Sequence, residues 1–300
     1  MAYTVSSETI RSRAALGYLA AGVTVLIWAS WLIVTRHSAS IHLGTIELGL
    51  CRFGIPALAL APVWWRHGIL PRGVPLHVLA VMVLGSGALF FQVTAHGIHS
   101  AEAGFSGVLL GGAMPFATAV IGILIFRNRL DGARYLGLAA IFCGSSMLLL
   151  PHVLSGGSDW SGALMILAGA ALWGSYTHAF RQSDLPPLHA SAIIAFWSFV
   201  IHLVLAAVYG VDFSQVSLSE SGLQLLSQGV LSGLVATFTY GVAVRSLGGI
   251  QAAAFTALTP VLAVLGGATV LGEQPGPSVF VATAFTCIGV LLSTGLLSRK

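Results

Sequence analysis

Residues 25–36 read VLIWASWLIVTR, and the landmarks of this apolar stretch return later in the chain at a constant offset. Trp28 and Trp173 are 145 residues apart, and the same offset relates further positions without a gap. These pairs are Ser30 with Ser175, Trp31 with Tyr176, Arg36 with Arg181, Pro115 with Pro260, Gly122 with Gly267 and Gly144 with Gly289. The chain is therefore predicted to be a duplication of one structural unit.

The composition indicates an integral membrane protein. Of the 300 residues, 56% are hydrophobic and only 7% are charged, and the mean hydropathy is +0.92. A helix needs roughly 20 apolar residues to cross a ~30 Å hydrocarbon core. Ten segments reach that length: 14–35, 44–65, 75–98, 103–126, 132–150, 160–181, 188–209, 222–245, 250–271 and 277–297. These are continuous apolar runs without the alternation of barrel strands, so we predict an all-α membrane protein with ten transmembrane helices.

The basic residues predict the orientation of these helices. Arg36 falls at one side of the expected membrane, whereas the opposite side collects Arg11, Arg13, Arg66, Arg72, Arg127, Arg129, Arg134, Arg181, Arg245, Arg299 and Lys300. Cytoplasmic loops are enriched in Lys and Arg, so both termini are expected in the cytoplasm. The net charge of +4 reflects this topology and requires no nucleic-acid partner.

Each copy of the repeat contains five segments, an odd number, so the second copy is expected to run in the opposite direction across the membrane. Inverted repeats are typical of transporters. The predicted organisation is a cytoplasmic tail at 1–13, a first five-helix repeat at 14–150, a periplasmic linker at 151–159, a second five-helix repeat at 160–297 and a cytoplasmic end at 298–300.

Motifs for cofactor or metal chemistry are absent from the sequence. It contains no HExxH, no GxxxxGK[ST] and no Cys/His zinc cluster, and its three cysteines lie in apolar segments without ligand spacing. We therefore expect no cofactor, metal or ATP hydrolysis. The tetrapeptide GFSG at 104–107 resembles the nucleophile motif of rhomboid intramembrane proteases, which leaves a protease with Ser106 as nucleophile as an alternative to a transporter or a channel-like pore.

Aromatic and hydroxyl side chains share one face of the first segment. The residues at helical spacing there are Thr24, Trp28, Trp31 and Thr35. Lipid-facing surfaces favour aliphatic residues, so this stripe indicates a face toward protein or a cavity. An aromatic belt at the membrane interface is the alternative for Trp31.

Arg52 is the basic residue that lies well inside an apolar segment. Burial of a charge there costs at least ~2.5 kcal/mol, so Arg52 needs a partner. Glu47 on the same helix, carbonyls at helix ends and snorkelling toward the interface are all open. We predict a structural or gating role, and contact with a substrate carboxylate is the alternative.

Pro115 and Pro260 lie near the middle of their segments at equivalent positions of the repeat. A proline removes the donor that would bond to the carbonyl four residues earlier, which belongs to Gly111 in one copy and Thr256 in the other. Two free carbonyls near the midplane would suit an ammonium group. The alternative is that the prolines only kink the helices.

The third segment carries Gln92 and His96 on one face. A buried amide must find hydrogen-bond partners, and His96 is either a packing residue or a ligand of the cavity. No Asp or Glu lies at the centre of a segment, which favours a passive carrier over a proton-driven pump. The single Arg52 argues against organic anions such as sugar phosphates.

These features together resemble the drug/metabolite transporter superfamily, and its EamA-type members in particular. The resemblance covers residues 14–297 and rests on the duplicated five segments, WAS at 28–30 against WGS at 173–175, Arg52, the midhelix prolines and LGEQ at 271–274. In EamA-type repeats a glutamate often ends the fourth helix of each unit. Glu273 fits this pattern, whereas Asn128 stands at the equivalent position of the first copy.

Within the superfamily the chain is most similar to YddG-type exporters of aromatic amino acids. That resemblance implies helices around a central cavity in the bacterial inner membrane and export of aromatic and other apolar amino acids by alternating access. A broad-specificity efflux carrier for drugs or amphipathic metabolites is the alternative.

The expected aromatic and apolar lining is Trp28, Trp31, Phe91, Met114, Trp173, Tyr176 and Tyr240. The groups expected to bind the zwitterion are Gln92, His96, Thr237 and the carbonyls of Gly111 and Thr256, with Arg52, Pro115 and Pro260 as structural or gating residues. The expected partners are the amino acid and the lipid bilayer, and the oligomeric state is left open.

Overall fold

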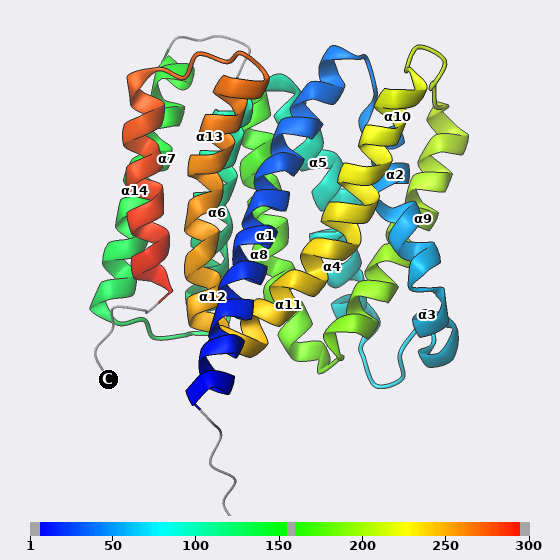
Figure 1. The fold of residues 1–300 in the computed structure, drawn as a ribbon, viewed down its shortest axis with the longest axis horizontal. Helices are drawn as coiled ribbons and strands as arrows, with labels where there is room; N and C mark the ends of the chain where they lie inside the picture. The colour runs from blue at the N-terminus through cyan, green and yellow to red at the C-terminus, as the bar shows by residue number, and fades with distance from the viewer. Residues whose placement is uncertain (1–6, 155–159, 295–300) are drawn as a thin grey trace, which may run out of the picture.

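The computed structural model describes residues 7–154 and 160–294, and every regular element in these two stretches is a helix (Figure 1). The first half contains α1 (Ser7–Ser40), α2 (Thr45–Ala59), α3 (Ala61–His67), α4 (Leu76–Ser86), α5 (Ala88–Ser100), α6 (Ala103–Leu124) and α7 (Gly132–Leu154). The second half contains α8 (Trp160–Ser183), α9 (Pro187–Tyr209), α10 (Leu218–Gln224), the π-helix η1 (Leu225–Val235), α11 (Ala236–Leu247), α12 (Gly249–Phe255), the 3₁₀ turn η2 (Thr256–Leu258), α13 (Thr259–Val270) and α14 (Pro277–Ser293). The expected all-α class is confirmed. The predicted C-terminal end at 298–300 and most of the predicted linker lie outside the described residues.

Eight runs among the described residues are long and apolar enough to cross a membrane: Ala14–Ser40, Leu76–Ser100, Ala103–Leu124, Gly132–Pro151, Trp160–Ser183, Pro187–Tyr209, Leu218–Leu247 and Gly249–Val270. The expectation of a multi-pass membrane protein is confirmed. The second predicted segment corresponds to the bent pair α2 and α3, and the tenth to the shorter α14. Helix α7 also continues through Pro151 to Leu154, so it extends into the predicted linker.

The second predicted segment is not one straight helix. It breaks at Leu60, and α2 and α3 meet at an angle of 63°. The break follows from Pro62 in the first turn of α3, because proline lacks the N–H that would continue the helical ladder and its ring clashes with the preceding turn. The indole N–H of Trp64 donates to the carbonyl of Ala57 at 2.8 Å, which gives one carbonyl near the break a partner.

Contacts between helices follow the repeat. Helix α1 packs mainly on α11. Its repeat equivalent, α8, packs on α4 and α5. This contact corresponds to the first one, because α4 and α5 are the repeat equivalents of the span that ends in α11. In the same way α13 packs on α1 and α6 packs on α8. Three further contacts join a helix to its own equivalent: α2 to α9, α6 to α13 and α7 to α14.

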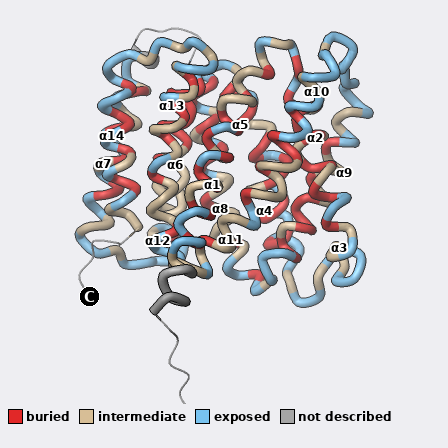
Figure 2. The backbone as a smooth tube through the Cα atoms, viewed as in Figure 1, coloured by how far each residue is buried: buried red, intermediate tan, exposed pale blue. Residues whose placement is uncertain are grey.

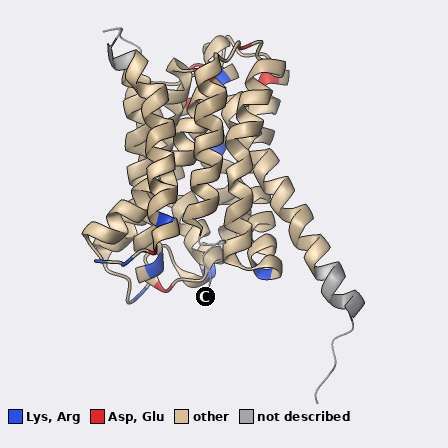
Figure 3. Ribbon diagram, turned by 90° about the vertical axis from the view of Figure 1, so that its left-hand side faces the viewer, with Lys and Arg blue, Asp and Glu red and all other residues tan. Residues whose placement is uncertain are grey.

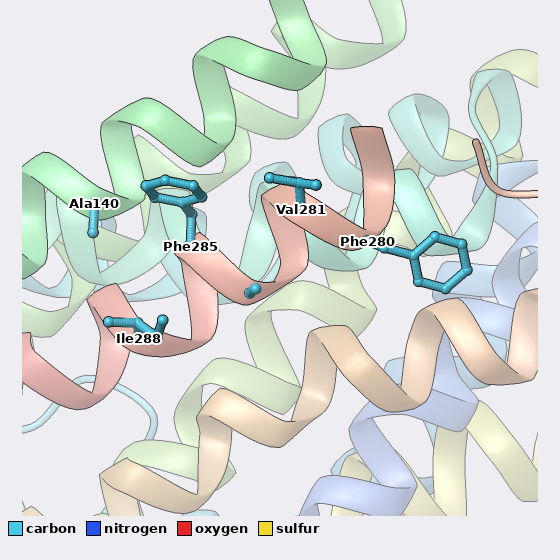
Figure 4. Close-up of a pocket in the computed structure, with 6 residues that line it drawn as sticks. Ala140, Phe280, Val281, Phe285 and Ile288 are labelled. Atoms are coloured by element: carbon cyan, nitrogen blue, oxygen red, sulfur yellow. The ribbon is translucent and has the colours of Figure 1, made fainter. Parts of the chain in front are cut away.

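Buried residues run along the centres of the helices, whereas the ends and outer faces are exposed (Figure 2). The largest buried cluster includes Trp31, Phe53, Phe91 and Phe105. Large apolar side chains are also exposed, such as Trp65 and Leu124, as expected for a surface that faces lipid. A shallow apolar groove between α7 and α14 at one edge of the molecule belongs to this outer surface (Figure 4).

Candidate substrate site

Two aromatic clusters occupy repeat-related positions. On α1 the ring of Trp28 lies 5.4 Å from that of Tyr240 on α11. On α8 the ring of Trp173, the repeat equivalent of Trp28, lies 5.3 Å from Phe90 on α5 and 5.2 Å from Tyr176. Trp28 and Trp173 are both half-buried, so each tryptophan keeps part of its ring free of protein contact.

Trp31 and Phe91 have a different environment from these clusters. Both are buried, and their ring centroids are 6.5 Å apart. The indole N–H of Trp31 donates to Oε1 of Gln228 at 2.8 Å. An interfacial aromatic belt is therefore the wrong interpretation of Trp31, and the two rings form packed core in this conformation.

A buried hydrogen-bond network surrounds Gln228, which the sequence analysis missed. Its Nε2 donates to Oγ1 of Thr35 at 3.0 Å and to Oε1 of Gln224 at 3.4 Å. Gln224 in turn donates to the carbonyl of Val34 at 3.4 Å. Both glutamines are fully buried, and the only available signal was two amides spaced four residues apart in an otherwise apolar segment.

Arg52 finds its partners in the same network and not in Glu47. Its Nη1 lies 3.4 Å from the carbonyl oxygen of Gln228, and its guanidinium lies 5.9 Å from the ring centroid of Trp31. Glu47 instead accepts the backbone N–H of Asp212 at 2.9 Å. The cation is thus held by a carbonyl and an aromatic face, which fits the structural role predicted for Arg52.

Loss of the Gln228 amide should therefore destabilise the fold. In Gln228→Leu the new side chain is close in volume to glutamine. It leaves the Trp31 N–H and the other partners of the Gln228 amide unpaired in a dry interior, at a cost of about 1–3 kcal/mol. We expect a lower Tm in detergent. Gln251→Leu, at an exposed residue of α12, is the matched control, and equal Tm values for the two variants would contradict this role.

Gln92 is engaged within the protein. Its Nε2 lies 2.8 Å from the carbonyl oxygen of Thr45 and 2.9 Å from Nε2 of His202, and its Oε1 accepts the Thr45 hydroxyl at 2.7 Å. The ring of His202 is completed by the Ser198 carbonyl, 2.7 Å from Nδ1. His96 is exposed one turn before the end of α5. The structure therefore does not bring Gln92 and His96 together as free ligands.

The two prolines have different surroundings. Pro115 lies inside the continuous α6, whereas Pro260 is in the first turn of α13, after the 3₁₀ turn η2. The prediction of a free Thr256 carbonyl is wrong, because this carbonyl accepts the N–H of Thr259 as the backbone tightens into the 3₁₀ turn. The carbonyl of Gly111 still loses its donor to Pro115 and remains a candidate.

Two further candidates lie on the site helices. Met114 is half-buried and packs against the main core cluster, and its carbonyl accepts the hydroxyl of Thr118 at 2.8 Å. Thr237 is exposed on α11, with its hydroxyl 3.5 Å from the Gly233 carbonyl. Thr237 and His96 are therefore the exposed polar side chains of the predicted set.

Ser106 does not have the environment of a protease nucleophile. It is fully buried, and its Oγ has no hydrogen-bond partner within the described part of the chain. His99, a potential base, lies with Nε2 2.9 Å from Oγ of Ser38. The protease alternative is therefore wrong, because a serine nucleophile needs a hydrogen-bonded base.

Repeated apolar spans with paired aromatic residues between them define a multi-pass membrane protein. The chain belongs to the EamA-like transporter family, which matches residues 15–150 and 160–295, one match in each predicted copy. It is 34% identical over 213 residues to the "Uncharacterized protein PA1977" of Pseudomonas aeruginosa, covering 69% of this chain and 71% of that one. It is 26% identical over 283 residues to the "Probable terminal-alkyne amino-acid exporter" of Streptantibioticus cattleyicolor, covering 90% of each chain. A solved crystal structure has the same fold, with a TM-score of 0.63 and 19% identity over 96% of this chain and 99% of that chain.

Proposed function

We propose that this protein exports amino acids, aromatic and other apolar ones among them, from the bacterial cytoplasm. The observation that carries the proposal is the similarity along 90% of both chains to a protein named as an amino-acid exporter. The aromatic clusters at Trp28 and Trp173 supply flat apolar surfaces that suit an aromatic or apolar side chain. We also propose that the chain shares the function of the YddG-type exporters that it resembles in sequence.

The proposed mechanism is alternating access by ten spans in two inverted repeats. In Figure 1, α1 rises from the lower end of the molecule, whereas α8 descends toward the turn that begins α9, and this supports the inversion. Most Lys and Arg residues gather at the lower end (Figure 3), where α1 begins and α14 ends (Figure 1), and the positive-inside rule supports a cytoplasmic position for that end. The two halves would then rock about a site near the midplane.

The polar part of the proposed site is smaller than the sequence indicates. Gln92 and the Thr256 carbonyl already have partners within the protein, so the exposed His96 and Thr237 and the Gly111 carbonyl are left to bind the zwitterion. This observation favours the second candidate function, a broad-specificity efflux carrier for drugs or amphipathic metabolites. Such a carrier needs aromatic surface and few polar contacts.

Counterflow in proteoliposomes distinguishes the two functions. Vesicles loaded with unlabelled phenylalanine should accumulate labelled phenylalanine, and aromatic and apolar amino acids should compete, whereas an amphipathic cation should not. Competition by the cation alone would instead support the efflux carrier. Flux that fails to saturate would indicate a pore. A pH gradient should leave the rate unchanged, because no carboxylate lies at the centre of a span.

A further inference from the structure

Equivalent helix ends at the two sides of the molecule have different surroundings. At the upper end in Figure 1, α6 begins against α13, and a Cβ placed on Gly104 would lie 3.2 Å from Cα of Val264. Gly249, the repeat equivalent of Gly104, begins α12 near the lower end, where an added Cβ would meet nothing within 4 Å. Gly104 is buried and Gly249 is exposed. The upper junction is therefore closed where the equivalent lower junction is open.

The contact between α1 and α5 shows the same difference. Arg36 donates to the carbonyl of His99, and Oγ of Ser38 lies 2.9 Å from Nε2 of His99. On α8, Arg181 is the equivalent of Arg36, and it is exposed. The equivalent of His99 is Val244, whose side chain cannot form a hydrogen bond. Within the described residues, a second, independent set of contacts thus joins the helices at the upper end and has no counterpart at the equivalent lower positions.

Glu273 joins the two halves at the closed end. Its Oε1 accepts the N–H of Ala103 at 2.7 Å, and its Oε2 accepts the N–H of Gly104 at 3.3 Å. These amides open α6, a helix of 22 residues. The first amides of a helix lack intrahelical partners, and the helix dipole favours negative charge at this position. The carboxylate therefore caps a helix of the first half from a loop of the second half.

Asn128 occupies the same backbone motif at the other end. Its N–H donates to the carbonyl of Gly122 at 3.0 Å, as the N–H of Glu273 donates to the carbonyl of Gly267 at 3.1 Å. The residue before each has a positive φ, 53° and 69° respectively. The Asn128 side chain is exposed, and within the described residues no hydrogen bond joins it to the start of α12. The fold thus presents Asn128 toward the lower end as it presents Glu273 toward the upper end.

We propose that Glu273 and Asn128 are alternative latches, a proposal that rests on the alternating access proposed above. Glu273 caps α6 when the upper end is closed, and Asn128 caps the span Gly249–Val270 when the lower end closes. The Gly248 N–H already donates to a carbonyl of α11, so Gly249 supplies the amide for the lower latch. Charge-assisted hydrogen bonds are roughly twice as strong as neutral ones. The pairing of a carboxylate above with an amide below therefore favours the state with the upper end closed.

The test measures both ends of the full-length protein in lipid nanodiscs by pulsed electron paramagnetic resonance. With Cys51, Cys143 and Cys287 replaced by serine, spin labels are placed in pairs at exposed positions: Ser100 with Gln274 at the upper end, and Arg129 with Gln251 at the lower end. Glu273→Gln should lower the ratio of upper-closed to lower-closed molecules about 10-fold. Asn128→Glu should shift this ratio in the same direction by a similar factor. Asn128→Gln introduces a side chain as long as that of glutamate but without its charge, and it should leave the ratio unchanged.

Unchanged distance populations in Asn128→Glu would overturn the latches. Asn128 is exposed, so Asn128→Glu does not threaten folding and decides the question even if Glu273→Gln lowers Tm. A shift of equal size in Asn128→Gln would also overturn the proposal, because side-chain length and not charge would then be responsible. The measurement needs no substrate, so its failure is separate from a failure of phenylalanine counterflow.

Discussion

Gly49→Ala is expected to destabilise the protein by roughly 2–3 kcal/mol or to abolish its accumulation in the membrane. A Cβ at this position of α2 would overlap the imidazole of His202 on α9. The gain in helix propensity from glycine to alanine, about 1 kcal/mol, is too small to offset this overlap. The prediction is checked by the Tm of the purified protein in detergent.

The overlap cannot be relieved easily because the ring of His202 is held on several sides. Nδ1 lies 2.7 Å from the Ser198 carbonyl oxygen and Nε2 lies 2.9 Å from Gln92. The rings of Phe53 and Phe91 lie 5.2 and 6.0 Å away. His202 is fully buried, so moving its ring breaks hydrogen bonds in a dry interior.

The matched control for Gly49→Ala is Gly241→Ala. Gly241 lies inside α11, where an added Cβ meets nothing within 4 Å. The Tm of Gly241→Ala should therefore equal or slightly exceed that of the parent protein. The double variant Gly49→Ala with His202→Ala should lose less stability than the two single variants added together, because His202→Ala removes the ring that the added Cβ would overlap. Equal Tm values for Gly49→Ala and Gly241→Ala would show that α2 and α9 do not pack as described.

The sequence predicted the all-α class and the multi-pass membrane character well, because the length and composition of a span are local properties of the chain. It predicted one uninterrupted segment at 44–65, because a count of apolar residues does not register the effect of Pro62 near the end of the run. The polar contacts inside the membrane were predicted least well. Gln228 binds Trp31 from 197 positions away along the chain, and no spacing rule connects two such residues.

The Glu47 alternative for Arg52 and the prediction of a free Thr256 carbonyl failed for a similar physical reason. Glu47 and Arg52 are near each other in sequence, but Glu47 turns to the backbone of Asp212, and Arg52 turns to the Gln228 carbonyl. Pro260 does remove a helical donor, but the backbone tightens and gives the Thr256 carbonyl another one. In both cases the chain satisfies a buried polar group by the nearest partner in the folded structure. Sequence alone shows only that a partner is needed.

Trp28→Ala and Trp173→Ala are each expected to reduce phenylalanine counterflow about 10- to 100-fold at substrate concentrations below saturation. Burial of an aromatic side chain against another ring contributes about 1.5–3 kcal/mol, and 1.4 kcal/mol corresponds to tenfold in affinity. The half-buried rings of Trp28 and Trp173 stand at equivalent positions of the two halves. Loss of either ring should therefore remove one wall of the proposed site.

Trp65→Ala is the control for both variants, since Trp65 lies on α3 with 80% of its surface exposed and should leave counterflow unchanged. Trp28→Phe should retain much of the activity, because it keeps an aromatic face at the same place. If Trp28→Ala and Trp173→Ala both transported at the parental rate in correctly inserted protein, the aromatic clusters would be packing elements of the α1–α11 and α5–α8 contacts. The substrate would then have to bind against a different face of these helices.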